Sequence, residues 1–208
     1  MHISSYQHVQ DLTQRYLANM AGQQLNIFDI GSYDVNGSYK ELFLNKQWQY
    51  TGIDMREGPN VDKVMSNPYK LPINTHQADV LVSGQAFEHI EYFWLSWLDM
   101  VRATKPGGYI FLIAPSRGPE HRFPVDCWRF YPDSYRALAR FGQMQLKEVT
   151  TDWEPSEHPD SAAWGDTVGV FKKPAHNRYF GKLRDYSAHR LMLWISQWII
   201  QPQNEPPH

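Results

Sequence analysis

The chain has 208 residues, of which 42% are hydrophobic, and its 20 basic and 22 acidic residues give a formal net charge of −2. This length and composition fit one domain with a sizeable core and exclude global disorder, and the near-zero charge offers no broad attraction to phosphate backbones, so we expect no nucleic-acid partner. The single cysteine, Cys127, cannot form an intramolecular disulfide, and the nine scattered histidines lack the paired spacing of metal ligands, so we expect no metal.

Strands and helices are predicted to alternate along the first half of the chain. A helix is expected at about residues 4–21, because apolar residues recur there at helical spacing, and Gly22 is a suitable stop. The apolar run LNIFDI at residues 25–30 predicts a buried strand. The remaining elements expected in this half are a helix that begins within residues 38–44, a strand at 50–54 and a weak strand at 61–65.

The second half continues the alternation and then departs from it. The almost continuously apolar residues 78–83 predict a central parallel strand. We expect next a helix at 90–104, a KPGG turn at 105–108, a strand at 109–114 and a helix at 132–141 with proline in its first turn. Strands at 146–151 and 167–171 have no long helix between them and predict an antiparallel hairpin at a sheet edge. A tail at about residues 174–208 is expected to contain a last helix at 188–200.

The segment IFDIGSYDVNGSY at residues 27–39 is the first sign of a ligand site. A buried strand leads to Asp29 and Gly31, and the following loop ends in Gly37 at the expected helix start. Glycine lets the backbone approach a ligand closely, and a helix N-terminus presents free N–H groups to an anion. A carboxylate for an ammonium, followed by N–H groups for a carboxylate, suits the methionine part of S-adenosylmethionine (SAM) better than a pyrophosphate.

Two further signals follow at informative distances. Asp54 ends YTGID and lies 23 positions after Gly31, close to the offset of about 20 residues expected for a carboxylate that binds ribose hydroxyls. The KPGG turn comes after the strand at 78–83 and its helix. Each signal is weak alone, but their order and spacing together favour a nucleotide-type cofactor.

Residues 26 to about 141 resemble the class I SAM-dependent methyltransferases, close to the methyltransferase type 11 group. DIGSYDVNG resembles the first motif of that family, YTGID the second, ADVLVSGQAFEHI the fourth-strand motif, and ATKPGGYIFLIAPS the turn and fifth strand. The resemblance implies a single Rossmann-like doubly wound α/β domain over residues 1–208, with a mostly parallel seven-stranded sheet and an antiparallel C-terminal strand. It implies SAM as cofactor, bound by Asp29, Gly31, Ser32, Tyr33, Gly37, Asp54, Met55, Asn67, Pro68, Ser83 and Gln85.

Two positions depart from the pattern of the family. Five residues, among them the bulky Tyr33, separate Gly31 from Gly37, where the family has closely spaced glycines, so Tyr33 is placed to cover the cofactor. Asn67 stands where the family commonly has an acidic residue for the adenine amino group, and its carbonyl oxygen can still accept a hydrogen bond.

The segment PSRGPEHRFPVDCWRFYPD at residues 115–133 follows the fifth strand, at the edge of the sheet where ligands bind. RGPEHRFPVDCWRFYPDSYRAL also resembles a subgroup found in surface-polysaccharide and sugar-modifying gene neighbourhoods. Charged side chains, with Trp128, Phe130 and Tyr131 as walls, suit a polar acceptor with flat apolar faces such as a sugar, although an ordinary solvated loop is the alternative. His121 is the first candidate for the catalytic base, followed by Asp126 and Glu88, whereas His89 is expected to pack at a helix start.

These features predict methyl transfer from SAM to a small polar acceptor, such as a hydroxyl of a sugar or glycan precursor. A non-catalytic SAM-binding scaffold is the main alternative, and a dinucleotide oxidoreductase is disfavoured because the loop does not spell GxGxxG. No secretory signal is visible, and the apolar stretch at 191–200 is too short to span a bilayer, so a cytoplasmic protein without a transmembrane segment is expected. The sequence leaves a homodimer open.

Overall fold

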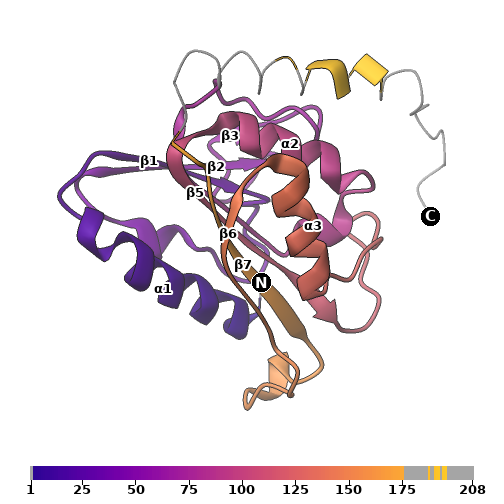
Figure 1. Cartoon of the computed structure of the whole chain (residues 1–208). Coiled ribbons are helices and arrows are strands. Elements are labelled where there is room, and N and C mark those ends of the chain that lie inside the picture. The colour runs from indigo at the N-terminus through magenta and orange to yellow at the C-terminus, as the bar shows by residue number, and fades with distance from the viewer. Residues whose placement is uncertain (1, 176–186, 188–189, 193, 196–208) are drawn as a thin grey trace.

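In the computed structural model, one seven-stranded sheet forms the centre of the molecule (Figure 1). The described residues are 2–175, 187, 190–192, 194 and 195. The strands are β1 (Leu25–Ile30), β2 (Trp48–Asp54), β3 (Lys63–Val64), β4 (Ala78–Gly84), β5 (Thr104–Arg117), β6 (Gln145–Thr151) and β7 (Gly165–Lys172). The α-helices are α1 (Ile3–Leu17), α2 (Phe93–Ala103) and α3 (Pro132–Gly142), and the 3-10 turns are η1 (Ala18–Met20), η2 (Lys40–Phe43), η3 (Phe87–His89) and η4 (Pro159–Ser161).

The strand order is β3-β2-β1-β4-β5-β7-β6. All neighbouring pairs are parallel except those of β7, which runs antiparallel to both β5 and β6. The predicted fold class, a mostly parallel seven-stranded sheet with an antiparallel C-terminal strand, is therefore confirmed. The β6–β7 hairpin forms because the connection between these strands, residues 152–164, contains only the short turn η4 and no crossover helix.

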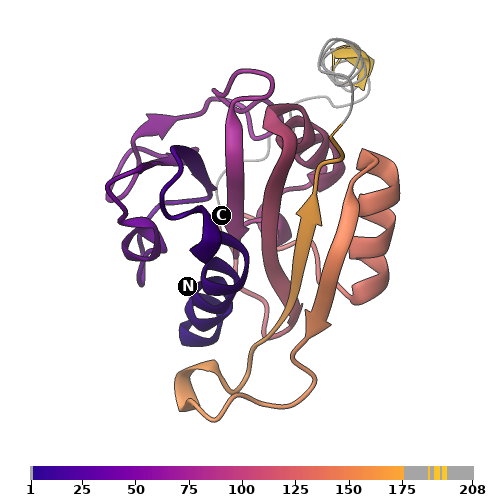
Figure 2. The same cartoon turned by 60° about the vertical axis from the view of Figure 1, so that its left-hand side comes forward.

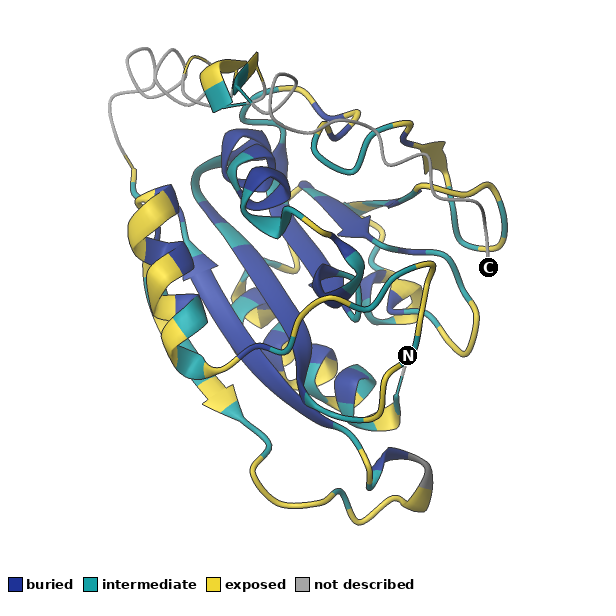
Figure 3. Cartoon of the chain, turned by 90° about the vertical axis from the view of Figure 1, so that its right-hand side faces the viewer, coloured by how far each residue is buried: buried dark blue, intermediate teal, exposed yellow. Residues whose placement is uncertain are grey.

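Helices cover both faces of the sheet, as the alternation of side chains along its strands requires (Figures 1 and 2). On one face, residues such as Ile27, Val80 and Phe111 pack against α1 and η2. On the other, Phe28, Leu81 and Ile110 pack against α2 and α3. The central strands are consequently buried along their length, whereas the outer face of α3 is exposed (Figure 3).

The strand order reverses its direction between β1 and β4, because β2 and β3 lie on one side of β1 and the later strands lie on the other. This position provides room for a ligand site. β1 lies between β2 and β4, with Ile30 opposite Ile53 and Asp29 opposite Val82. Because these three strands are parallel, their carboxyl ends meet at one edge of the sheet. Ligands of open α/β sheets bind in the crevice at such a switch point.

Several predicted elements differ from the observed ones. The helix expected to begin within residues 38–44 is only the turn η2, because side chains at Ser38 and Asn45 accept the backbone N–H groups of Lys40 and Gln47 and compete with helical bonding. The KPGG residues belong to β5, whose register shifts beside them. The helix expected at 90–104 begins at Phe93.

The tail lies mostly beyond what the structure describes. Of the predicted helix at 188–200, most residues fall outside the described ones, so this expectation stays a prediction. Within the described residues, no helix is both long and apolar enough to cross a bilayer.

Candidate active site

A cavity of about 660 Å³ lies at the carboxyl ends of β1, β2 and β4. All but two of the predicted cofactor-binding residues line this cavity. They are Asp29, Gly31, Ser32, Tyr33, Gly37, Asp54, Met55, Pro68 and Gln85. The catalytic candidate His121 lines it as well, so the predicted cofactor residues and one predicted catalytic residue share a single space.

Asp29 is a buried carboxylate at the floor of the cavity. The hydroxyl of Tyr50 on β2 donates a 2.6 Å hydrogen bond to its Oδ2. Burial raises the pKa of Asp29 to about 7, and the negative charge of Asp54 adds to this rise, while the bond from Tyr50 opposes it. A carboxyl group with this pKa is ready to be paired with a cationic ligand, because the positive charge would offset the cost of burying the ionised form.

The turn after β1 requires glycine at position 31. Gly31 has φ of +84°, and a Cβ there would lie 2.6 Å from the Cβ of Ala86 in the loop after β4. Its N–H donates to the carbonyl of Ile53 at 2.9 Å. This close approach keeps the two loops that border the cavity together.

Asp54 joins the loop after β1 to the loop after β2. Its carboxylate accepts the backbone N–H of Tyr33 on one oxygen and that of Arg56 on the other, both at 3.1 Å. A carboxylate oxygen has two lone pairs, so both oxygens retain acceptor capacity towards the cavity. Asp54 can thus position the loops and still accept ligand hydroxyls.

The environment of Gly37 differs from the expectation. Its N–H donates to Oδ1 of Asp34 at 2.7 Å, and the residues between Gly37 and β2, all of them described, form only η2. The prediction that an α-helix begins after Gly37 is therefore wrong. An anionic ligand group near this loop cannot use the N–H of Gly37 without displacing Asp34.

Ser83 and Asn67 do not line the cavity. The Ser83 hydroxyl is buried and donates to the carbonyl of Ile30 at 3.0 Å, which ties β4 to β1. Asn67 uses its side-chain oxygen to accept the N–H of Tyr69 at 2.8 Å, while the adjacent Pro68 does reach the cavity. Ser83 therefore joins two strands beside the site, and Asn67 shapes the turn that contains Pro68.

Gly84 and Tyr39 line the cavity although sequence reasoning missed them. A Cβ on Gly84 would lie 2.0 Å from the hydroxyl oxygen of Tyr39, and this hydroxyl is 2.6 Å from that of Ser5 on α1. A glycine at the end of a buried strand was the available signal for Gly84. The position of Tyr39 depends on the packing of α1 and had no local signal.

The segment after β5 returns to the cavity and forms part of its wall. The N–H of Cys127 donates to the carbonyl of Glu88 at 2.7 Å, and the Trp128 indole donates to the carbonyls of Ile90 and Glu91. These bonds hold the segment against η3. The part that lines the cavity comprises His121, Phe123, Pro124 and Val125, together with His89 from η3.

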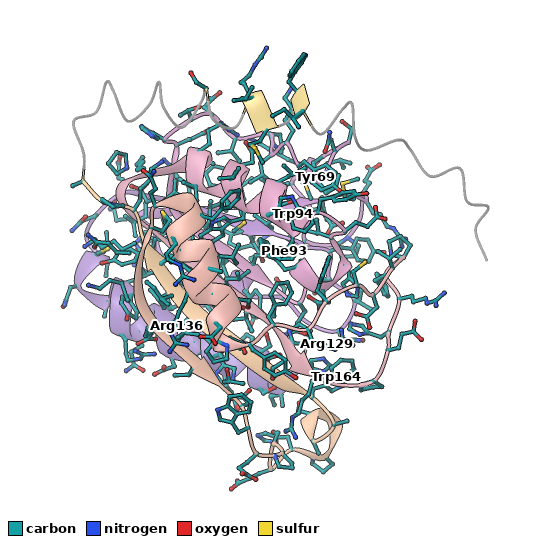
Figure 4. All side chains as sticks on the ribbon, turned by 45° about the vertical axis from the view of Figure 1, so that its right-hand side comes forward. Tyr69, Phe93, Trp94, Arg129, Arg136 and Trp164 are labelled. Atoms are coloured by element: carbon teal, nitrogen blue, oxygen red, sulfur yellow. The ribbon has the colours of Figure 1, made fainter. Side chains whose placement is uncertain are left out.

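The three aromatic residues that we expect as walls of the acceptor site do not lie at the cavity. Phe130 is buried in the core beside Phe93, and Trp128 packs against Phe93 and Trp94. Phe93 and Trp94 belong to α2 and are labelled in Figure 4. Tyr131 is exposed and stacks on Trp153. Trp128, Phe130 and Tyr131 therefore do not line the cavity, because these rings pack on Phe93, Trp94 and Trp153 instead.

Asp126 holds the same segment together without lining the cavity. Its two oxygens accept hydrogen bonds of 2.6 and 2.8 Å from the Arg129 guanidinium, which holds the pKa of Asp126 well below its usual range. It also accepts the backbone N–H of His121 at 2.8 Å, and its Oδ2 lies 3.4 Å from Nδ1 of His121. An ionised carboxylate in such a pair orients His121 and is a poor proton acceptor.

Glu88 lies behind the two histidines of the cavity wall. Its side chain is fully buried, and within residues 2–175 neither carboxylate oxygen has a hydrogen-bond partner. Its Oε1 is 3.6 Å from Nε2 of His89 and 3.9 Å from Nε2 of His121. Burial raises the pKa of Glu88 to about 8. The structure thus brings His89 together with Glu88 and His121, two of the three predicted candidates for the base.

Comparisons with known proteins agree with this geometry. Residues 28–112, which run from β1 into β5, match the family model of the methyltransferase domain. An uncharacterized methyltransferase of Mycobacterium leprae (strain Br4923) is 28% identical over 164 residues, which cover 69% of this chain and 58% of that protein. The chain therefore spans little more than half the length of this curated relative.

Solved structures show the same fold at low identity. A 1,6-didemethyltoxoflavin-N1-methyltransferase of Burkholderia thailandensis, with 1,6-didemethyltoxoflavin and S-adenosylhomocysteine bound, superposes with a TM-score of 0.59 at 15% identity and covers 83% of this chain and 85% of that one. The [4+2]-cyclase SpnF gives a TM-score of 0.62 at 12% identity over 81% of each chain. The order of the motifs, the sheet topology and the domain match over residues 28–112 together show that this part of the chain is similar to the class I SAM-dependent methyltransferases, a family whose cofactor is SAM.

Proposed function

We propose that this protein transfers a methyl group from SAM to a hydroxyl of a small polar acceptor, such as a sugar or a glycan precursor. The observation that supports the proposal most is one continuous cavity that both Asp29 and His121 line. Its volume of about 660 Å³ is within the range of about 300–1,000 Å³ typical of small-molecule sites.

SAM would lie across the ends of the first two strands. Asp29 would receive the ammonium of its methionine part, and Asp54 would accept the ribose hydroxyls. Met55 and Pro68, which line the cavity, would border the adenine. Tyr33 also lines the cavity, and its ring packs on Gly58, where a Cβ would lie 2.3 Å from Cε2 of the tyrosine. This contact holds the ring of Tyr33 beside the cofactor position.

The acceptor would enter between His89, His121 and Phe123. Polar imidazoles beside an apolar ring suit a hydroxylated molecule with an apolar face. In the simplest form of the reaction, His121 takes the proton of the acceptor hydroxyl, and the oxygen attacks the methyl carbon as the C–S bond electrons pass to sulfur. Burial lowers the pKa of His121, so it is neutral and able to accept a proton at pH 7. Asp126 would orient the imidazole, and Glu88 would lie behind it.

Calorimetry and a transfer screen test this function. We expect SAM and S-adenosylhomocysteine to bind, and NAD not to bind. Methyl-labelled SAM should then transfer label to at least one compound in a panel of sugars, nucleotide sugars, lipids and small phenols. Binding of NAD alone would exclude methyl transfer, and SAM binding without transfer to any acceptor would favour the scaffold alternative.

A further inference from the structure

We propose that Glu88, His89 and His121 form a binding site for a divalent transition-metal cation at the acceptor end of the cavity. One ligand atom from each side chain lies within 4.8 Å of the other two. Two ligands about 2.0–2.1 Å from one tetrahedral cation are about 3.3–3.4 Å apart. The observed separations of 3.6 and 3.9 Å from Glu88 Oε1 to the two Nε2 atoms need only a small contraction to reach that spacing.

Glu88 gives an independent reason to expect a cation. Its carboxylate is fully buried and, among the described residues, has no hydrogen-bond partner on either oxygen. A buried carboxylate is costly unless a positive charge or hydrogen-bond donors compensate it. A cation between Glu88 and the two imidazoles would satisfy this group where no donor does.

The two histidines are oriented as metal ligands usually are. Nδ1 of His89 lies 2.6 Å from the carbonyl oxygen of Val125. Because a carbonyl only accepts, Nδ1 has the proton and the lone pair of His89 is on Nε2, which is the atom nearest Glu88. Nδ1 of His121 faces Asp126 at 3.4 Å, which leaves Nε2 towards Glu88. A carbonyl partner such as that of His89 fixes the ring orientation of a ligating histidine, whereas Asp126 accepts the backbone N–H of His121 and not its Nδ1.

The donor set indicates the class of cation. Two imidazole nitrogens and one carboxylate oxygen suit zinc, iron, cobalt or nickel better than magnesium or calcium, which prefer oxygen ligands alone. Three protein ligands also leave a coordination position open. Since His89 and His121 line the cavity, that open position would face the acceptor.

A second cluster, His8, Asp152 and Asp166, has similar spacing but a simpler explanation. His8 Nε2 is 2.9 Å from Asp152 Oδ2, and Asp166 accepts a 2.8 Å hydrogen bond from Gln85. His8 and Asp152 are thus paired with each other and Gln85 donates to Oδ1 of Asp166, whereas Oδ2 of Asp166 has no hydrogen-bond partner among the described residues. The cluster therefore serves as a control.

The catalytic role of the cation rests on the proposed function, whereas its binding does not. An acceptor hydroxyl on the open position would lose its proton to water more readily, because the cation stabilises the alkoxide. The alkoxide oxygen would form the bond to the methyl carbon, the C–S bond would break with its electrons on sulfur, and the cation would be unchanged. In this form of the mechanism, His121 is a ligand and not the base.

Cobalt titration of the full chain, without a histidine tag and after chelator treatment, tests the site directly. We expect Co²⁺ to produce a visible d–d absorption band that Zn²⁺ abolishes by competition and Mg²⁺ does not. Glu88→Gln and His121→Ala should each weaken Co²⁺ binding by roughly a hundredfold, since even outer-shell partners contribute about 10–100-fold to metal affinity. His8→Ala and the exposed His158→Ala should retain the band. Retained SAM binding, measured by calorimetry, would show that each variant is folded.

The possible results separate this proposal from the proposed function. Wild-type protein that binds SAM but gives no Co²⁺ band would overturn the cation site, as would a band that survives in both Glu88→Gln and His121→Ala or disappears in His8→Ala alone. Protein that binds Co²⁺ through these residues but transfers no methyl group would keep the site and refute the proposed function. Methyl transfer that a chelator leaves unchanged would refute the catalytic role of the cation.

Discussion

The hydroxyl of Tyr50 donates a 2.6 Å hydrogen bond to Asp29, so β2 provides the hydrogen-bond donor for the buried carboxylate of β1. Tyr50 itself accepts a 2.8 Å hydrogen bond from the side-chain amide of Asn60. This chain of bonds stabilises the ionised form of Asp29, while burial and the charge of Asp54 favour the protonated form. The protonation state of Asp29 at neutral pH is therefore balanced, and SAM binding should depend on it.

The affinity for SAM should rise between pH 6 and pH 7.5. Because the pKa of Asp29 in the free protein is about 7, SAM must displace a proton from this group below that pH, which costs up to tenfold in Kd per pH unit. Above about pH 8 the affinity should fall again, since the α-amino group of the ligand loses its own proton near there. Calorimetry at constant ionic strength, across pH 5.5–9, measures the curve.

Two variants test this pH dependence, one that should shift the curve and one that serves as the control. Tyr50→Phe removes a donor that lowers the pKa of Asp29, so the acidic limb should move to higher pH. Asp133→Asn, at a side chain that is 95% exposed on α3, should leave the curve unchanged. A wild-type affinity that is flat between pH 6 and 8 would rule out Asp29 as the partner of the ammonium.

Asp29→Asn should stabilise the free protein at pH 8 while it weakens SAM binding. The folded-state pKa of Asp29 lies above its ordinary value of 3.8, so the folded protein holds its proton when the unfolded chain has lost it. The free energy of unfolding of the wild type should therefore fall as pH rises from about 4 to about 7, by on the order of 3–4 kcal/mol from this group. Asparagine does not ionise, so the variant lacks this pH-dependent loss of stability.

Urea unfolding of both proteins at pH 5 and pH 8 measures this effect. The unfolding free energy of the variant minus that of the wild type should be larger at pH 8 than at pH 5 by a few kcal/mol, because only the wild type loses stability as Asp29 ionises. Equal pH slopes for the two proteins would contradict the assignment of a raised pKa to Asp29.

Gly84→Ala should disturb the cavity through Tyr39. The new Cβ would lie 2.0 Å from the Tyr39 hydroxyl oxygen, and the buried ring would have to move and give up its contact with Ser5. Overpacking of this kind costs about 1–3 kcal/mol of stability, and we expect at least a tenfold loss of SAM affinity with it. Thermal unfolding and calorimetry measure the two effects.

Gly22→Ala is the matched control, because a Cβ at position 22 would meet nothing within 4 Å. It should leave SAM affinity unchanged and alter stability by less than about 1 kcal/mol. If Gly84→Ala behaved like Gly22→Ala, the packing of Tyr39 against β4 could not be important for the site.

His121→Ala should lower turnover by roughly 10²–10⁴-fold and leave the Kd for SAM nearly unchanged. The side chain of His121 is 31% exposed and belongs to the segment after β5, not to the loops after β1 and β2 that we assign to SAM, so its loss should remove chemistry and not cofactor contacts. Steady-state kinetics with the acceptor found in the screen, and calorimetry with SAM, give the two numbers. A loss of SAM affinity as large as the loss of activity would show that His121 does not act on the acceptor.

Local sequence patterns determine the central strands and the residues at their ends. The runs LNIFDI and ADVLVSG are mostly apolar without alternation, as is typical of strands that helices cover on both faces of a sheet. Both runs are predicted as strands, and both form buried strands in the structure. Asp29, Gly31 and Asp54 stand at the ends of such strands, and parallel strands bring their carboxyl ends to the same edge. Their places around the cavity therefore followed from position along the chain.

The tertiary structure decided everything that depends on how distant segments pack. Glu88, His89 and His121 come together only because the segment after β5 is bonded back to η3, and no spacing in the sequence shows this. The same packing takes Phe130 into the core and leaves Tyr131 outside, although the two are adjacent aromatic residues in the sequence. Local hydrophobic pattern determines which segments become strands, whereas the environment of each loop side chain is set by contacts between residues far apart in the chain.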